Sequence, residues 1–414
     1  MSIATTPDPS AAADNGVLTG LKLIDTDTHF SEPYDLWTSR APAKYKDRVP
    51  KVQKAPNGEL MWFLDEHPIF QAGGVSFVDK DENKIPYFQQ DITGRGNLWE
   101  EIHEASYDAK ARVKFMDNLG VHAQIVYPNI MGFQMGELLA LEDKDLAYAI
   151  VRTYNDAMGE WAAQGIGRLY PMAILPFWDI DLAIKESVRA KDELNLHGIT
   201  MSGEPHAAGL PDLGRPAWDP FYEAITDLGF PINIHVGSVP VAGAGAGHMQ
   251  TAHMQTAWPS LPDRAHKPVN SVQIELANSR FVSNLVVSDI PRRWPDVKWV
   301  SVESGIGWIP YVLERVDYEN LEDFVNEPTP NVPSAFENFR KSLYGCFWFE
   351  KAGPTLLLDY LGPDNIMWET DFPHPTCLHP EAVRRSAEAL SQVGPENLRK
   401  IMQDNAARLY NIPL

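Results

Sequence analysis

Residues 21–29, LKLIDTDTH, form an apolar run of strand length that places Asp25, Asp27 and His29 at alternate positions. Alternate side chains of a β-strand point to the same face, so the three polar groups would share one face. Such groups on an otherwise apolar strand are solvated, are hydrogen-bonded in a core network, or bind a metal. Which of these holds depends on the fold that contains the strand.

Seven more apolar runs of strand length follow along the chain, and helical patterns lie between most of them. The eight runs are 21–29, 123–128, 169–177, 198–203, 230–237, 298–305, 343–349 and 365–371. A strand followed by a helix, repeated in this way, indicates a parallel sheet, and eight units that close on themselves make a (β/α)8 TIM barrel. The alternative is an open doubly wound sheet. Eight units are too many for a usual open sheet, so we predict an α/β fold of the TIM barrel class.

Two segments interrupt the repeat. Residues from about 30 to 110 and from 239 to 269 follow the first and fifth strands, so we expect insertions on the C-terminal face, where barrel active sites are built. A small hairpin is expected around GELMWFLDEHPIF (58–70), and the second insertion contains HMQTA twice in succession. We expect residues 1–20 to be a flexible polar segment and residues 21–414 to form one barrel domain.

The composition narrows the class of partner. The 414 residues have a formal net charge of −21 at pH 7. This charge argues against nucleic acid or an anionic membrane, because contacts to phosphate need clustered Lys and Arg. Two cysteines are too few for a disulfide framework and fit a reducing cytoplasm. No run approaches transmembrane length, so we expect a cytoplasmic protein that acts on a small molecule.

Ionisable residues gather where four of the predicted strands end. In chain order they are Asp27, His29, His235, Glu303, Asp371 and, just beyond the last strand, His374. Each one taken singly has an ordinary structural explanation, such as a helix cap. A barrel, however, brings its strand ends around one axis. Carboxylates and imidazoles that converge there match divalent metals such as zinc, iron, manganese or cobalt.

Several longer motifs, in order, resemble a known family. They include IDTDTHFSEP (24–33), FMDNLGVHAQIVYPN (115–129), SVESGIGWIPYVLERVD (301–317), IMWETDFPHP (366–375) and NAARLY (405–410). With them, the chain resembles the amidohydrolase-related family of the metal-dependent amidohydrolase superfamily, in the branch typified by aminocarboxymuconate-semialdehyde decarboxylase. The resemblance covers essentially the whole chain from residue 21.

This resemblance implies a mononuclear divalent metal, commonly zinc, with iron or manganese as alternatives. The four matching ligands are Asp27, His29, His235 and Asp371. The metal would activate its bound water, and Asp371 would also carry the proton. The family's decarboxylases have a histidine on the sixth strand, where this chain has Glu303. We interpret Glu303 as a general acid or base, or as a further metal ligand that can bridge two ions.

His374 has three readings: a second acid–base candidate, a ligand of a second metal, or a hydrogen-bond partner of Asp371. Only the C-terminal end of a barrel strand reaches the active face. Asp25 therefore lies one layer below Asp27, where we predict hydrogen bonding in the interior. Glu32, just past the strand, is either a partner of a metal ligand or an anchor of the loop.

Three functions are weighed, the first two of which the resemblance implies. The first is hydrolysis or decarboxylation of a small carboxylated or carbonyl-bearing molecule, with Asp371, Glu303 and His374 as catalytic residues. The second is a dinuclear non-haem iron, or iron–manganese, monooxygenase component with Glu303 as the extra ligand. The third is an inactive structural subunit of a complex. We expect a homodimer or an assembly with a related subunit.

Overall fold

The computed structural model describes residues 16–72, 76–86, 99–238, 257–323 and 333–414. Eight of its strands pair in parallel. Seven lie inside predicted runs, and the second, which begins at Val121, overlaps the run predicted at 123–128. They are β1 (Leu23–His29), β5 (Val121–Tyr127), β6 (Leu169–Pro171), β7 (Ile199–Met201), β8 (Ile232–His235), β9 (Trp299–Val302), β10 (Leu343–Phe347) and β11 (Ile366–Trp368). The prediction of parallel strands is therefore confirmed.

These strands form two sheets, ordered β1-β5-β6 and β11-β10-β9-β8-β7. The prediction of one closed barrel sheet is thus met only in part. At the two seams single parallel bridges join Thr28 to Phe372 and Ala173 to Ile199. Continuous pairing stops there for local reasons. Asp371 has a left-handed φ of 60°, which interrupts extended backbone, and Pro171, which ends β6, has no N–H to donate.

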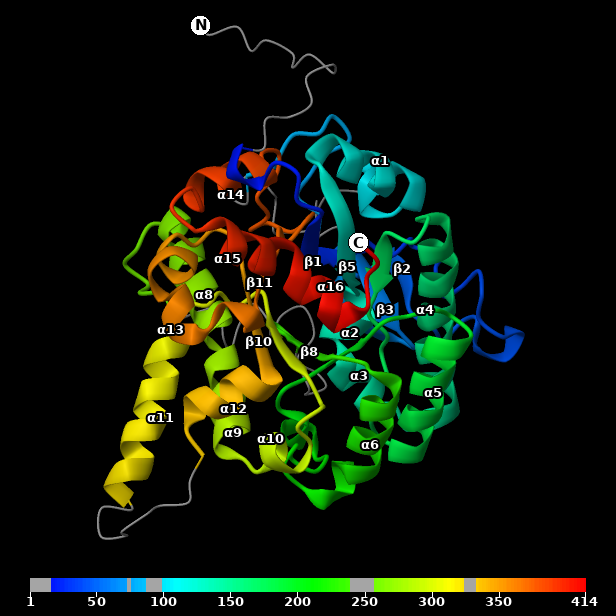
Figure 1. Cartoon of the computed structure of the whole chain (residues 1–414). Helices are drawn as coiled ribbons and strands as arrows, with labels where there is room; N and C mark the ends of the chain where they lie inside the picture. Colours follow the sequence, from blue (N-terminus) through cyan, green and yellow to red (C-terminus); the bar gives the residue numbers. More distant parts are fainter. Residues whose placement is uncertain (1–15, 73–75, 87–98, 239–256, 324–332) are drawn as a thin grey trace, which may run out of the picture.

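Helices lie around the strands (Figure 1). The longer ones are α1 (Ala109–Leu119), α4 (Lys144–Gln164), α5 (Ile180–Asp192), α6 (Asp219–Leu228), α8 (Asp263–Leu276), α9 (Asn278–Val287), α11 (Ile309–Asp323), α12 (Ala335–Ser342) and α14 (Ala382–Ala389). The shorter ones are α2 (Ile130–Phe133), α3 (Met135–Ala140), α10 (Ile290–Arg293), α13 (Leu358–Leu361), α15 (Pro395–Arg399) and α16 (Asn405–Tyr410).

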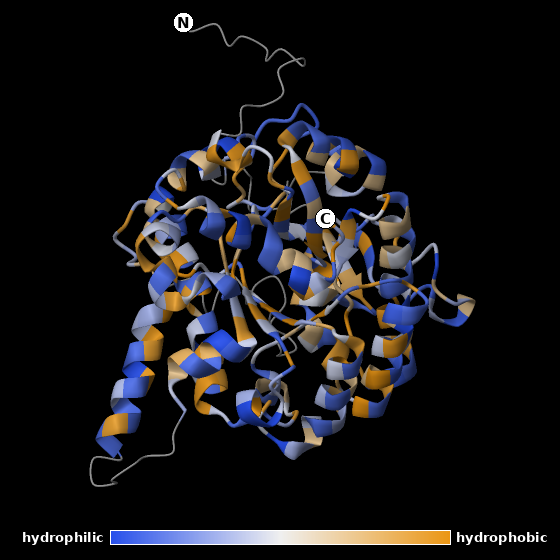
Figure 2. Cartoon of the chain, in the orientation of Figure 1, coloured by the Kyte–Doolittle hydropathy of each residue, from blue (hydrophilic) through white to orange (hydrophobic). Residues whose placement is uncertain are grey.

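Helix α4 shows why these segments are helical and how they pack. Asp143 caps its first turn by accepting a hydrogen bond from the Leu146 N–H. Leu146, Ile150 and Tyr154 recur at helical spacing and are fully buried. Hydrophilic and hydrophobic segments alternate around the helices in Figure 2. The apolar faces pack on the strands and leave the strand ends to carry polar groups.

Between β1 and α1 lies a separate antiparallel sheet of β2 (Lys51–Lys54), β3 (Leu60–Leu64) and β4 (His67–Gln71). The hairpin predicted at residues 58–70 corresponds to β3 and β4. Strand β2 was not predicted, because its KVQK sequence is polar and lacks the alternation of a half-buried strand. Trp62 of β3 packs edge-on against Trp37, with ring centroids 5.6 Å apart, and so anchors this sheet to the core.

The bounds of the second predicted insertion, 239–269, stay a prediction, and helix α8 begins within them at Asp263. Most of the HMQTA repeat, including His248 and His253, lies outside the described residues. Gly16–Leu18, assigned above to the flexible segment, form a 3-10 helix whose Leu18 is buried, because this apolar side chain packs into the main core.

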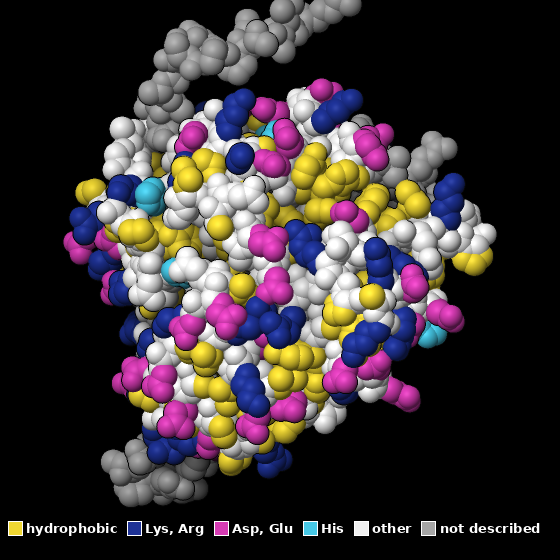
Figure 3. Space-filling model, turned by 90° about the vertical axis from the view of Figure 1, so that its right-hand side faces the viewer, with side chains coloured by type: hydrophobic (Ala, Val, Ile, Leu, Met, Phe, Trp, Pro, Cys, Tyr) yellow, Lys and Arg dark blue, Asp and Glu magenta, His cyan; other side chains and the backbone are white. Residues whose placement is uncertain are grey.

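The surface carries charged side chains of both signs (Figure 3). On the face shown in Figure 3, acidic and basic side chains are interspersed. None of the helices in the described ranges is long and apolar enough to cross a membrane.

Candidate metal centre

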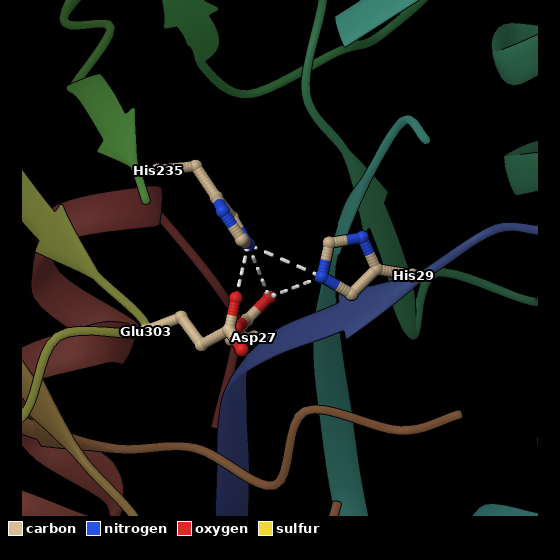
Figure 4. Close-up of side chains that lie close together, drawn as sticks. All are labelled: Asp27, His29, His235 and Glu303. Atoms are coloured by element: carbon tan, nitrogen blue, oxygen red, sulfur yellow. Dashed lines mark hydrogen bonds and ion pairs between the residues drawn. The ribbon is translucent and has the colours of Figure 1, made fainter. Parts of the chain in front are cut away.

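The strand ends bring four of the predicted ligands together. Asp27 and His29 lie at the end of β1, and His235 is the last residue of β8. Glu303 directly follows β9, and His235 pairs with Val302, the residue before it. Figure 4 shows the four side chains pointing toward one another. The parallel register of β8 and β9 places His235 beside Glu303, and β1 of the other sheet brings Asp27 and His29 to the same group.

Distances between these donors fit a coordination shell. The Nε2 atom of His29 lies 3.3 Å from Asp27 Oδ1 and 3.1 Å from His235 Nε2. His235 Nε2 lies 3.5 Å from Asp27 Oδ1 and 3.7 Å from Glu303 Oε2. Donors that bind one ion at about 2.0–2.2 Å stand about 3–4 Å apart. Asp27 and His29 are fully buried, and both Asp27 carboxylate oxygens lack a hydrogen-bond partner among the described residues.

His235 is held in the tautomer that a metal requires. Its Nδ1 lies 2.7 Å from the Val236 carbonyl oxygen, which can only accept a hydrogen bond, so Nδ1 bears the proton. The Nε2 lone pair is therefore directed into the cluster. A histidine ligand usually donates its other N–H to such an acceptor, which fixes its orientation.

Asp371 and His374, which follow β11, lie beside these four residues. Asp371 Oδ1 is 3.5 Å from His29 Nε2 and 3.0 Å from His374 Nδ1. The Thr376 hydroxyl contacts Asp371 Oδ2 and lies 3.3 Å from Glu303 Oε1, so it joins the two carboxylates. His374 Nε2 lies 2.7 Å from Asn129 Oδ1. All six residues predicted for the site thus gather in one buried region.

Electrostatics in this region favour a bound cation. Burial raises the pKa of the Glu303 carboxyl well above its usual value, and the nearby Asp371 and Asp27 charges raise it further. Burial would also raise the pKa of Asp27, but the imidazoles of His235 and His29 lower it below its usual value. Burial, with the neighbouring His374, lowers the pKa of His29 to about 4. Crowded carboxylates repel one another, and a divalent cation offsets that repulsion.

Glu303 and Asp371, in the loops that follow β9 and β11, have unusual backbone conformations. Glu303 has φ of 50° and Asp371 has φ of 60°, in the left-handed region that residues other than glycine seldom adopt. Such conformations persist where the surroundings hold them, often at active sites. The Glu350 carboxylate accepts the N–H groups of Ile306 and Gly307, both at 2.8 Å. It thereby fixes the loop that follows Glu303.

Beneath the centre lies a buried hydrogen-bond network that orients β1. Asp25 accepts hydrogen bonds from the Thr370 N–H at 2.8 Å, from the Thr370 hydroxyl at 2.6 Å and from Gln124 Nε2 at 3.2 Å. Arg112, also fully buried, donates to Gln124 Oε1 at 3.2 Å and to the His29 carbonyl at 2.6 Å. The hydrogen-bonding role predicted for Asp25 is confirmed.

Glu32 is an anchor of the loop. Its Oε1 accepts the N–H groups of Asn129 and Ile130 at 2.8 and 3.0 Å, at the start of α2. Asn129 in turn donates to the Phe30 carbonyl at 2.7 Å and contacts His374. Glu32 therefore connects the end of β1 to the residue that orients His374.

The Glu32 carboxyl gives the protein a pH-dependent stability. Burial raises its pKa from 4.5 to about 7. The neutral acid is thus favoured in the folded state, and this contribution to stability is lost as pH rises through 7. We expect Glu32→Gln to reduce the fall in unfolding free energy between pH 4.5 and 8 by about 3 kcal/mol at most. Denaturant unfolding at several pH values in this range measures the unfolding free energy, and substitution of the exposed Glu193 by Gln is the control. Equal slopes for wild type and Glu32→Gln would refute the assignment.

Sequence reasoning missed three residues at the centre. Asn129 and Thr376 are single polar residues in loops and have no pattern that marks them. Glu369 is fully buried, and its Oε2 lies 3.3 Å from the Glu303 N–H. It stands two residues before Asp371, the same alternation that drew attention to Asp27 and His29, and this signal would have found it.

Several solved structures share the fold of this chain. An amidohydrolase, map2389c, from Mycobacterium avium subsp. paratuberculosis K-10 aligns with a TM-score of 0.69 at 18% identity, over 94% of this chain and 99% of that chain. The Metarhizium anisopliae IDCase in apo form aligns with a TM-score of 0.64 at 17% identity, over 96% and 98%. A dihydroxybenzoic acid decarboxylase from Polaromonas sp. JS666, with bound manganese and the inhibitor 2-nitroresorcinol, aligns with a TM-score of 0.56 at 18% identity, over 94% and 97%.

At these identities the structural likeness establishes a shared fold. The sequence itself matches the amidohydrolase family model Amidohydro_2 over residues 24–412, which is nearly the whole chain. The chain therefore belongs to this amidohydrolase family.

Proposed function

We propose that this chain is a metal-dependent enzyme that cleaves a C–C or C–N bond in a small carboxylated or carbonyl-bearing molecule. Decarboxylation of an aromatic acid is the reaction that we favour. The observation that carries the proposal is the convergence of Asp27, His29, His235 and Glu303 donor atoms within 4.8 Å of one another. Family membership and the fold shared with the dihydroxybenzoic acid decarboxylase support it.

The residues present fit a first-row divalent ion, because imidazole nitrogens and unpaired carboxylate oxygens form the donor set. In this proposal Asp27, His29 and His235 hold the ion, and Asp371 and Glu303 are further ligands. A bound ion supplies Lewis-acid polarisation of a substrate oxygen and lowers the pKa of a bound water. Manganese is a candidate ion as well as zinc, because the matched dihydroxybenzoic acid decarboxylase was solved with manganese bound.

The acid–base roles follow from the surroundings of each group. As a general acid, the role that is the alternative to ligation, the Glu303 carboxyl would donate its proton to carbon or to a leaving group, and the raised pKa of this carboxyl favours that role. Asp371 and His374 are 3.0 Å apart and can hold a second proton between them. The Phe133 ring lies 5.0 Å from the His235 ring and 5.7 Å from the His29 ring, and gives the site an apolar wall suited to an aromatic acid.

A substrate screen tests the proposal. We expect the protein loaded with Mn2+ or Zn2+ to release CO2 from at least one hydroxylated benzoic acid, and we expect a chelator to abolish this activity until metal is restored. Amide and lactone substrates form the second arm, since hydrolysis uses the same centre. A metal-loaded protein that turns over neither class would contradict the proposed function.

The alternative of a dinuclear iron, or iron–manganese, monooxygenase component stays a prediction. A second group of donors around His374 favours it. Such an enzyme requires iron and an electron donor, so purified protein that binds zinc or manganese but excludes iron would contradict it. An inactive structural subunit would retain no metal-dependent turnover of any kind. Assembly as a homodimer, or with a related subunit, is likewise a proposal that light scattering of the purified chain can test.

A further inference from the structure

Glu369 is a buried carboxyl to which the proposed reaction gives no role. It directly follows β11, and its N–H donates to the Phe347 carbonyl at 3.0 Å, which continues the pairing of β11 with β10. The preceding residue, Trp368, donates its indole N–H to the Ser386 hydroxyl of α14 at 2.9 Å and so faces the helices. Neighbouring residues of an extended strand point to opposite faces. The Glu369 side chain therefore points into the interior.

A carboxyl in this position is costly. Glu369 is fully buried, and its Oε1 has no hydrogen-bond partner within the described part of the chain. Burial raises the pKa of this carboxyl well above its usual value, and the charge of Asp27 raises it further. A buried polar group costs free energy unless hydrogen bonds compensate. The contact that compensates is the hydrogen bond from the Glu303 N–H to Oε2, at 3.3 Å.

The loop that begins at Glu303 is held at both ends by carboxylates. Glu303 has a left-handed φ of 50°, which persists only where the surroundings hold it. At the far end of the loop, Glu350 accepts the N–H groups of Ile306 and Gly307, both at 2.8 Å. At the near end, Glu369 accepts the N–H of Glu303 itself. The residue with the unusual backbone is thus the one that Glu369 contacts.

This N–H bears directly on where the Glu303 side chain points. The angle φ is the rotation about the N–Cα bond, so an acceptor that fixes the N–H also fixes the frame from which the side chain projects. With the backbone held in this way, Glu303 Oε2 lies 3.7 Å from His235 Nε2, and Oε1 lies 3.3 Å from the Thr376 hydroxyl. Another value of φ would turn the carboxylate away from these groups.

We propose that Glu369 is a positioning residue for Glu303: it accepts the Glu303 N–H, holds the left-handed backbone, and thereby places the Glu303 carboxylate among the metal ligands. The inference rests on the proposed function, because it takes Glu303 as a ligand of the ion held by Asp27, His29 and His235. Glu369 is not itself one of the described residues whose donor atoms could hold an ion.

Two substitutions separate the reach of the side chain from its charge. Glu369→Gln keeps the length and one acceptor oxygen but removes the carboxylate. Glu369→Asp keeps the carboxylate but is one methylene shorter, which withdraws it from the Glu303 N–H. The affinity for Mn2+ is measured by titration of the metal-free full chain. We expect Glu369→Asp to weaken Mn2+ binding about 10–100-fold, the usual cost of losing a group that orients a metal ligand, and Glu369→Gln to bind Mn2+ as wild type does.

A double-mutant cycle with Glu303→Gln shows whether the effect passes through Glu303. In the Glu303→Gln background, Glu369→Asp should cause no further loss of Mn2+ affinity, because the ligand that Glu369 positions is already gone. Glu186→Asp is the matched control. It shortens another fully buried glutamate, which pairs with Arg189 and Asn155 on α5 and α4, and it should leave the Mn2+ affinity unchanged.

The outcomes separate this inference from the proposed function. Equal Mn2+ affinity in Glu369→Asp and wild type, or equally weak binding in Glu369→Gln and Glu369→Asp, overturns the positioning role. So does a loss in Glu369→Asp that is the same in both backgrounds, since it would reflect general loosening of the interior. Wild-type affinity in Glu303→Gln also overturns it and leaves the proposed function intact. Failure of the wild-type protein to bind Mn2+ would contradict the proposed function itself.

Discussion

Alanine in place of His235 is expected to remove the metal ion held by Asp27, His29 and His235 and to lower turnover by about 10³-fold or more. The imidazole is buried at the end of β8, and Val236 fixes its tautomer with Nε2 directed at Asp27 and His29. A metal supplies several kcal/mol of transition-state stabilisation, and each 1.4 kcal/mol is a factor of about ten in rate. Elemental analysis and turnover with the substrate found by screening measure both effects.

His122→Ala is the matched control for this experiment. His122 lies near the start of β5, at the opposite end of the strand from the centre, and contacts the Pro413 carbonyl at 3.0 Å. It should keep full metal content and turnover. If His235→Ala kept wild-type metal content while His122→Ala lost it, the site would lie elsewhere.

The second large effect is on stability. Asp25→Ala leaves the Thr370 N–H, the Thr370 hydroxyl and Gln124 without their acceptor in a fully buried position. Each buried polar group without a partner costs about 1–3 kcal/mol, so we expect a loss of about 3–5 kcal/mol in unfolding free energy. Asp25→Asn keeps the shape and one acceptor oxygen, and it should cost less than half as much. Denaturant unfolding measures both.

Comparing Asp25→Asn with Asp27→Asn distinguishes a residue that hydrogen-bonds beneath the centre from one that binds the metal. The two residues are on the same strand, two positions apart, and both are fully buried. Asp25→Asn should keep the metal, because no donor group of the centre includes Asp25. Asp27→Asn should lose most of it, because an amide is a weaker ligand for these ions than a carboxylate. Equal metal content in the two variants would contradict the two-layer description of β1.

Much of the centre could be predicted because it follows from strand periodicity. Asp27 and His29 alternate in an apolar run, and His235 ends another, so parallel strands were enough to bring them to one edge. Asp25 was placed one layer lower by the same reasoning. These residues depend on strand geometry alone, which the sequence specifies locally.

The remaining features depend on loops that no periodicity describes. Thr376 contacts the side chain of Asp371, and no sequence pattern predicts the left-handed backbone that this aspartate adopts. Asn129 meets His374 only through the fold, since 245 positions separate them. The seams between the two sheets have the same origin: they fall where Pro171 and Asp371 interrupt regular strand geometry.

The central claim is that the buried cluster at the strand ends binds a metal. An anomalous difference map from crystals of the protein grown with Mn2+ tests it most directly. We predict a peak within about 2.0–2.3 Å of donor atoms of Asp27, His29 and His235. A map in which manganese occupies other sites, or none, while this cluster shows no anomalous density would contradict the account.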